Sequence, residues 1–351
     1  MWLFAIRIVY RNWLIAARQG TACSGIVGAT AHHFDPRGPM TQFKQYIAEE
    51  IAIDHADGLF GRREALRRLG LLGLTAASAS ALLAACGSDS DTTATQSSAA
   101  TSSGSGAPAS AATSGSATAP GMSTALPTEA ITFAGPNGTL QGAWAAAPSP
   151  KGAVLVLHEN KGLTDHIRTI AGRLAGAGYS SLAVDLLSGK GGTATFSDPA
   201  QATAALADIP AENFVADMKA GVVELQKRAP GAKVGAIGFC FGGGLVWSLL
   251  ASGEPQLSAA VPFYGPLPDD ANFDGSKNAA VLAVYAGLDK RVNASMPEAE
   301  TALKAAGMRY RVQSVPGVDH AFFNDTGARY NEAAANTVYG QVMEWFGTYL
   351  G

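Results

Sequence analysis

The sequence predicts a doubly wound α/β domain with a mostly parallel sheet and helices on both faces. Three observations lead to this prediction. From residue 128 onward, short apolar runs alternate with longer segments of helical periodicity. The runs AVLVL (153–157) and AVLAV (280–284) are apolar throughout, as in parallel strands covered on both faces. Before residue 128 the composition is different, so the domain is expected to span residues 128–351.

The elements follow in order along this domain. Asn137-Gly138 separates two short strands and predicts a tight hairpin. We expect strands at 131–133, 140–146, 153–157, 181–185, 234–239, 258–263, 280–285 and 309–315. We expect helices at 166–175, 211–227, 241–250, 297–305 and 332–349.

Composition excludes several classes of function. The 351 residues carry a formal net charge of -3, and no basic run follows residue 68, so nucleic-acid binding is not expected. The cysteines form no CxxC pair, which argues against a zinc ribbon or a disulfide framework. His158-Glu159 lacks the second histidine of a zinc protease, because position 162 is Gly162. We therefore expect a monomer that needs neither metal nor organic cofactor.

The N-terminal region predicts export. Residues 61–86 contain paired arginines followed by an apolar stretch, the order of a twin-arginine signal. The sequence LAACG ends this stretch and resembles a bacterial lipobox, so Cys86 is the predicted lipidation site. This places the protein on the outer face of the cytoplasmic membrane, within the cell envelope. Residues 1–60 are interpreted as a leader, and Met40 offers a later start that would make residues 1–39 an annotation extension.

Residues 87–127 are almost entirely Ser, Ala, Thr and Gly. Such a segment has too little apolar surface to offset the entropy of ordering. It is therefore predicted to be a disordered tether between the membrane anchor and the catalytic domain.

The central motif is Gly238-Phe239-Cys240-Phe241-Gly242, between a predicted strand and a predicted helix. It has the form of a nucleophile elbow, with cysteine in the usual place of serine. The glycines leave room for the sharp turn, and the start of the helix favours a thiolate. The motif predicts Cys240 as a nucleophile.

A base and an orienting acid are expected after the nucleophile, in the order acid and then histidine. Asp289 follows a predicted strand, and His320 follows the next one. His320 would take the thiol proton, and Asp289 would hold the imidazole and stabilise its charged form. His158 at a strand end is a candidate pocket residue, whereas His166 is expected on the surface or as a helix cap.

Five motifs together resemble the dienelactone hydrolase family, and hence the α/β-hydrolase fold. They are HENKGL (158–163), VDLL (184–187), GFCFGG (238–243), GLD (287–289) and DHAF (319–322). The resemblance implies hydrolysis of a small lactone or ester through an acyl-cysteine intermediate. It also implies that Glu159 helps to form the thiolate, and that the backbone N–H groups of Phe241 and Asn160 form the oxyanion hole.

Two positions depart from the family pattern. The arginines that bind the substrate carboxylate in well-known members fall on Gly189 and Asn324 here. Lys190 is a candidate replacement as a point charge. Two other functions stay open: a carboxylesterase, thioesterase or peptidase with the same triad, and a non-catalytic lipoprotein that binds ligands in the cell envelope.

Overall fold

The computed structural model describes residues 42–86 and 118–351. In this part of the chain the centre is one eight-stranded sheet in the order β1-β2-β4-β3-β5-β6-β7-β8. The pairs β1–β2 and β2–β4 are antiparallel, and the remaining pairs are parallel. The strands are β1 (Glu129–Gly135), β2 (Gly138–Ala145), β3 (Gly152–Leu157), β4 (Tyr179–Asp185), β5 (Val234–Phe239), β6 (Leu257–Phe263), β7 (Ala280–Ala286) and β8 (Tyr310–Val315). The predicted fold class is confirmed.

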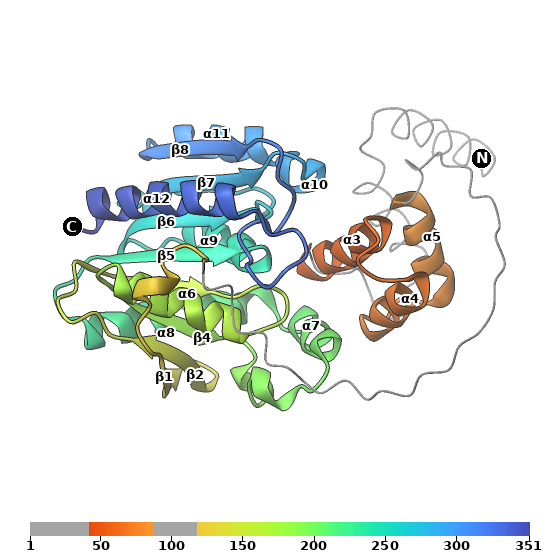
Figure 1. The fold of residues 1–351 in the computed structure, drawn as a ribbon, viewed down its shortest axis with the longest axis horizontal. Helices are drawn as coiled ribbons and strands as arrows, with labels where there is room; N and C mark the ends of the chain where they lie inside the picture. The colour runs from red at the N-terminus through yellow and green to blue at the C-terminus, as the bar shows by residue number, and fades with distance from the viewer. Residues whose placement is uncertain (1–41, 87–117) are drawn as a thin grey trace.

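Helices cover both faces of the sheet (Figure 1). On one face lie α6 (Asp165–Gly176) and α12 (Glu332–Tyr349), and on the other lie α8 (Ala211–Arg228) and α9 (Phe241–Ala251). Shorter helices are α7 (Pro199–Ala207), α10 (Lys290–Asn293) and α11 (Met296–Ala305). The predicted strands and helices are present, with ends that agree within two residues, whereas α7 and α10 were not predicted.

Burial explains why these sequences form strands. Every residue of β3, β4, β5 and β7 is buried, because helices cover both faces of the middle of the sheet. The edge strand β8 is only half-buried, and its sequence is correspondingly more polar. The carboxyl ends of the parallel strands meet at one edge of the sheet, where the predicted site residues lie.

Three further helices precede this domain: α3 (Gln42–Ala56), α4 (Arg62–Leu71) and α5 (Ala76–Cys86). They pack against one another, and α3 and α4 also contact α7 (Figure 1). The predicted apolar signal is thus divided between two helices, with Gly73 at a positive φ of 86° in the turn that separates them. Within the described ranges, no helix combines the length and the apolar character needed to cross a bilayer.

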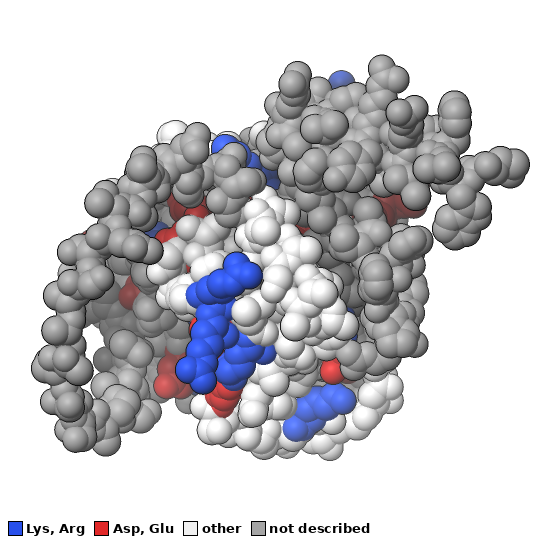
Figure 2. Space-filling model, turned by 90° about the vertical axis from the view of Figure 1, so that its right-hand side faces the viewer, with Lys and Arg blue, Asp and Glu red and all other residues white. Residues whose placement is uncertain are grey.

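The paired arginines of the predicted export signal lie on α4. Arg62 and Arg63 are exposed, whereas Arg68 is half-buried against the ring of Phe60. Figure 2 shows basic side chains grouped beside acidic ones on the face of the molecule that carries these helices. Export, lipidation of Cys86 and the interpretation of residues 1–39 stay predictions, and residues 1–41 lie outside the described part of the chain.

The last ten residues of the predicted tether, 118–127, are described, and they pack against α6. The backbone N–H of Leu126 donates to Gly172 O at 3.0 Å. A Cβ atom at Gly172 would lie 2.4 Å from Leu126 O, and one at Gly176 would lie 2.0 Å from Thr124 O. The two glycines of α6 therefore allow a backbone contact that composition did not reveal. Residues 87–117 lie outside the described part of the chain.

Candidate active site

The nucleophile elbow lies between β5 and α9. Cys240 has φ 57° and ψ -118°, a strained conformation for a residue with a side chain. A Cβ atom at Gly238 would lie 2.2 Å from Gly242 O, and one at Gly242 would lie 2.4 Å from Leu157 O. Glycine is thus required at both positions for this turn to pass beside β3. The elbow places the Cys240 side chain at the carboxyl edge of the sheet.

The predicted acid and histidine form a direct pair. His320 Nδ1 donates to Asp289 Oδ2 at 2.6 Å, and both residues are buried. Asp289 Oδ1 accepts from the backbone N–H of Val292 at 3.0 Å, which caps α10. Burial by itself would raise the pKa of Asp289, but His320, Arg291 and this N–H stabilise the carboxylate and lower its pKa to about 2. Asp289 is therefore an anion that orients the imidazole.

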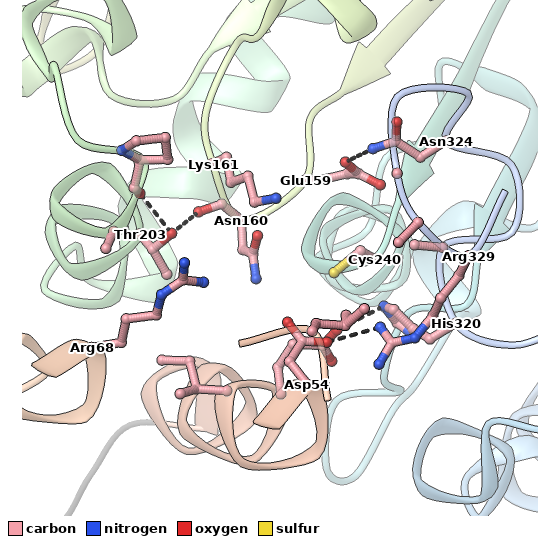
Figure 3. Close-up of a pocket in the computed structure, with 18 of the residues that line it drawn as sticks. Asp54, Arg68, Glu159, Asn160, Lys161, Thr203, Cys240, His320, Asn324 and Arg329 are labelled. Atoms are coloured by element: carbon pink, nitrogen blue, oxygen red, sulfur yellow. Dashed lines mark hydrogen bonds and ion pairs between the residues drawn. The ribbon is translucent and has the colours of Figure 1, made fainter. Parts of the chain in front are cut away.

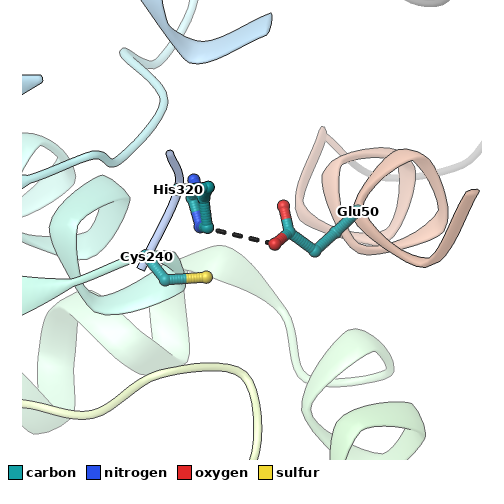
Figure 4. Close-up of side chains that lie close together, drawn as sticks. All are labelled: Glu50, Cys240 and His320. Carbon is teal, nitrogen blue, oxygen red and sulfur yellow. Dashed lines mark ion pairs between the residues drawn. The ribbon is translucent and has the colours of Figure 1, made fainter. Parts of the chain in front are cut away.

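The other ring nitrogen of His320 faces the cysteine and an unexpected carboxylate. Cys240 Sγ, His320 Nε2 and a carboxylate oxygen of Glu50 lie within 4.8 Å of one another (Figure 4). Glu50 belongs to α3, and its Oε1 lies 3.4 Å from His320 Nε2. Tyr46, also on α3, has its hydroxyl 3.4 Å from Cys240 Sγ in a buried hydrogen bond. The region predicted as a leader thus contributes two side chains to the site.

Arg291 connects these groups. Its side chain is 9% exposed, forms an ion pair with Glu50, and lies 4.3 Å from the centre of the Tyr46 ring. Neither Tyr46, Glu50 nor Arg291 was predicted as a site residue. The only available signal was the position of Arg291, two residues after Asp289. The α3 residues had none, because nearly two hundred positions separate Tyr46 from Cys240.

A cavity of about 260 Å³ opens beside Cys240 and His320 (Figure 3). Residues of the catalytic domain form one wall, among them Glu159, Asn160 and Lys161. Residues of α3 and α4 form the other wall, among them Glu50, Asp54 and Arg68. A cavity of this size suits a small molecule rather than a folded partner.

Glu159 lies at the edge of this cavity. Its Oε2 accepts a hydrogen bond from Asn324 Nδ2 at 2.6 Å, whereas its Oε1 is buried with no partner among the described atoms. The hydrogen bond recorded for the Cys240 thiol goes to Tyr46, not to Glu159. Asn324 therefore orients Glu159 in addition to lining the pocket, a role that its position in the sequence did not reveal.

The predicted oxyanion-hole residues lie at the same edge. Phe241 is the first residue of α9, so its backbone N–H has no acceptor within the helix. The backbone of Asn160 is held from the other side, since Thr203 Oγ1 of α7 donates to Asn160 O at 2.8 Å. The unpredicted helix α7 thus supports one of the two predicted N–H donors.

Two predicted substrate-binding residues lie elsewhere. His158 is fully buried, and both ring nitrogens are occupied: Nδ1 donates to Glu159 O at 2.7 Å, and Nε2 accepts from Leu186 N at 3.2 Å. Burial lowers its pKa, which keeps the ring neutral. Lys190 is exposed and is not part of the cavity wall. His158 therefore tethers two strand ends, and Lys190 does not replace the missing arginines.

His166 was expected on the surface, yet it is buried. Its Nδ1 lies 2.8 Å from Asp325 Oδ1, and Arg173 Nη2 donates to the same carboxylate at 2.9 Å. Asp325 belongs to the loop after His320 and follows Asn324 directly. The three buried side chains therefore tie the histidine loop to α6.

Glu50, Cys240 and His320 also offer the donor types of a zinc site. Arg291 already pairs with the Glu50 carboxylate, however, and its positive charge opposes a second cation at that position. The arrangement therefore favours acid–base chemistry between a thiol, an imidazole and carboxylates.

Comparison with known proteins agrees with this geometry. Residues 140–350 match the family model described as dienelactone hydrolase family. The chain belongs to the dienelactone hydrolase family. It is accordingly a hydrolase that acts on ester bonds, with an α/β-hydrolase fold.

Two curated relatives of this hydrolase carry the name "Putative carboxymethylenebutenolidase". The protein from Escherichia coli O157:H7 is 34% identical over 215 residues, which cover 58% of this chain and 79% of the relative. The protein from Salmonella typhi is 33% identical over 210 residues, which cover 56% of this chain and 77% of the relative.

Solved structures share the fold. The dienelactone hydrolase-like promiscuous phosphotriesterase P91 is 24% identical, with a TM-score of 0.56 over 65% of this chain and 100% of that one. The dienelactone hydrolase from Anabaena variabilis is 22% identical, with a TM-score of 0.51 over 64% of this chain and 98% of that one. The matched part is the catalytic domain, since the family model begins after α3, α4 and α5.

Proposed function

We propose that this hydrolase cleaves small esters or lactones through an acyl-cysteine intermediate, with Cys240, His320 and Asp289 as the catalytic triad. The 2.6 Å bond between Asp289 and His320, beside a cysteine on a strained elbow, carries this proposal. An imidazole held by an anion on Nδ1 can exchange a proton through Nε2, and Nε2 is the nitrogen on the Cys240 side.

The reaction runs in two halves. His320 takes the Cys240 thiol proton at Nε2, the thiolate adds to the carbonyl carbon, and the N–H groups of Phe241 and Asn160 stabilise the resulting oxyanion. The intermediate collapses, the C–O bond to the leaving group breaks, and the His320 imidazolium gives that oxygen its proton. His320 then takes a proton from water, whose oxygen attacks the acyl-cysteine and releases the acid and the thiolate.

Glu159 is assigned an auxiliary role in forming the thiolate. Glu159 lines the same cavity as Cys240, and its Oε1 has no partner among the described atoms, so a carboxylate oxygen is available when substrate displaces the resting contacts of the thiol. The cavity of about 260 Å³ describes the intact chain, because residues of α3 and α4 form one of its walls.

The test is hydrolysis of a panel of enol lactones and aryl esters by the wild-type chain and by Cys240→Ala. Activity is expected to fall by about 10³-fold or more, because the residual rate would depend on binding and the oxyanion hole alone. Asn293→Ala serves as a control, since its amide bonds to Ala286 O rather than to the triad. Equal activity in wild type and Cys240→Ala would contradict the assignment.

We also propose export and lipidation at Cys86, on the strength of the paired arginines and the lipobox-like LAACG sequence. The mature protein would then begin at Cys86 and be attached to the membrane. Fractionation of cells that express wild type and Cys86→Ala tests this proposal. The wild type is expected in the membrane fraction with an acylated N-terminal cysteine, and recovery of residues 42–85 in the mature protein would contradict it.

A further inference from the structure

Helix α3 lies over the active site and contacts the two reacting groups. The Tyr46 hydroxyl is 3.4 Å from Cys240 Sγ. Glu50 Oε1 is 3.4 Å from His320 Nε2, and Figure 4 shows this pair beside Cys240. Cys240 and His320 are each only 4% exposed in this arrangement. The contacts are therefore made to the same two atoms that the proposed reaction uses.

These contacts stabilise the resting state. The hydrogen bond between the Tyr46 hydroxyl and Cys240 Sγ, whichever atom donates, must be broken before sulfur can attack the substrate. A carboxylate at Nε2, together with Asp289 at Nδ1, places an anion at each end of the imidazole. Burial by itself lowers the pKa of His320, but Glu50, Cys240 and Asp289 outweigh burial and raise it well above the usual value. An interaction that stabilises the ground state without stabilising the transition state slows the reaction.

Charged contacts fasten α3 to the catalytic loops themselves. Glu50 pairs with Arg291, two residues beyond Asp289. Asp54 accepts from Arg329 Nη1 at 2.8 Å, and Asp57 pairs with Arg329 Nη2 at 2.5 Å. Arg329 belongs to the loop that follows His320. Each loop that carries a triad partner of the cysteine is thus bound by an acidic residue of the N-terminal segment.

Aromatic packing continues the contact to the elbow. The ring of Phe43 lies 5.2 Å from that of Phe241, the residue directly after the nucleophile, and 5.9 Å from that of Phe214. Both contacts are edge-to-face, a favourable geometry for aromatic pairs. The buried face of α3 is therefore matched to the catalytic domain in shape as well as in charge.

We propose that residues 42–86 inhibit the hydrolase in cis, with Tyr46 and Glu50 holding the thiol and the imidazole until the segment is separated from the catalytic domain. The proposal rests on the proposed triad. Cleavage of the chain between Cys86 and β1 would break the covalent link between α3 and the domain that it covers. The chain would then be inactive before processing and active afterwards.

The first experiment compares the intact chain with the double variant Tyr46→Phe/Glu50→Gln. Two rates are measured: hydrolysis of p-nitrophenyl acetate, and alkylation of Cys240 by iodoacetamide, followed on the Cys240 peptide by mass spectrometry. Both are expected to rise by about tenfold or more in the variant, since one unit of pKa or 1.4 kcal/mol of ground-state stabilisation corresponds to a factor of ten.

The matched control is Glu49→Gln, the same change one residue earlier on α3. Glu49 is also buried, but it accepts from Gln45 of its own helix rather than contacting the triad. Both rates should stay at the wild-type level in this control. A fall in hydrolysis in Tyr46→Phe/Glu50→Gln, with no faster alkylation, would overturn the inhibitory role and make these residues supports of catalysis.

A second experiment avoids substitutions in the buried contact. A protease recognition sequence is inserted between residues 87 and 117 of the full chain, which is cleaved and then diluted. Hydrolysis and alkylation are expected to rise after cleavage, and addition of excess released segment should reverse the rise. Unchanged rates after the segment has dissociated would overturn the proposal.

The two readouts separate this proposal from the proposed function. If Cys240 is alkylated faster after separation but neither the intact nor the separated protein hydrolyses the ester, the inhibitory contact is supported and the proposed activity is contradicted. Equal hydrolysis before and after separation, with equal alkylation, would leave the activity standing and remove the inhibitory contact.

Discussion

The two walls of the active-site cavity are built in different ways. On the catalytic side, Asp289, Cys240 and Glu159 follow β7, β5 and β3, and a continuous ladder of backbone hydrogen bonds sets their spacing. On the N-terminal side, α3 and α4 share no strand with the sheet and are attached by side chains. A ladder holds its strand ends together cooperatively, whereas ion pairs can be broken one at a time. Substitutions in the first wall should therefore change the catalytic step or the stability of the fold. Substitutions in the second wall should change how firmly α3 is attached to the catalytic domain.

The largest effect is expected from Asp289→Asn in the catalytic wall. The asparagine keeps an oxygen for the Val292 N–H, so α10 stays capped, but it no longer offers His320 a charged acceptor. We expect kcat to fall by about 10²- to 10⁴-fold with little change in melting temperature, because the tautomer and charge of the imidazole are no longer held. Steady-state kinetics and thermal unfolding measure the two quantities. A fall in kcat of less than about threefold would show that this pair only supports the fold.

A second large effect concerns the loop that carries His320. Arg173→Met removes the buried partner of Asp325 and leaves that carboxylate with His166 alone. The free energy of unfolding is expected to fall by about 3–5 kcal/mol, measured by urea denaturation. Arg168→Met is the matched control, because Arg168 is on the same helix and pairs with exposed Asp165 at 3.9 Å. The free energy of unfolding of the control should change by less than about 0.5 kcal/mol. Equal losses in the two variants would show that the Arg173–Asp325 pair does not stabilise the His320 loop.

A smaller effect concerns pH and the docked segment. Burial raises the pKa of Asp54 to about 6, and Glu50 is the strongest of the groups that raise that of His320 above 6.5. Both groups thus bind protons more tightly when α3 is docked. Their contribution to docking is complete below their ordinary pKa values and is lost as the pH rises through the raised ones.

The rate of the cleaved and separated chain, divided by that of the intact chain, should therefore fall as the pH rises above about 6, by roughly tenfold or less. The division cancels the titration that both forms share. Glu50→Gln should flatten the dependence, and a ratio that rises with pH would contradict the assignment of these protons to docking.

The smallest effect is expected at the rim of the same wall. Arg67 Nη1 lies 2.7 Å from Asp198 Oδ2, across the contact between α4 and α7, but the two side chains are 43% and 33% exposed. Solvent and salt screen such a pair, so Arg67→Ala should change the hydrolysis rate of the intact chain by no more than about twofold. A rise in hydrolysis rate as large as that expected for Tyr46→Phe/Glu50→Gln would show that the pair at the rim, rather than the buried contact, controls docking.

Much of the catalytic domain could be predicted because its signals are local. Apolar runs marked the covered strands, and the glycines around Cys240 marked a turn in which a Cβ atom would collide with the neighbouring backbone. His158 and His166 were placed less well, since a histidine at a strand end or a helix start can face either way. Both proved buried: the Leu186 N–H donates to His158 Nε2, and the Asp325 carboxylate lies 2.8 Å from His166 Nδ1. The helix α7 was missed because its alanine-rich sequence has no clear apolar stripe.

The sequence by itself therefore determined the sheet, the elbow and the order of nucleophile, acid and histidine, because strand periodicity and turn sterics act over a few residues. Only the tertiary structure decided which surface covers the site. The contact of α3 with Cys240 joins residues 194 positions apart, and it depends on charge and shape matching that no local pattern records. Residues of α3, which were interpreted as part of a leader, cover the catalytic site, and only folding brought this property to light.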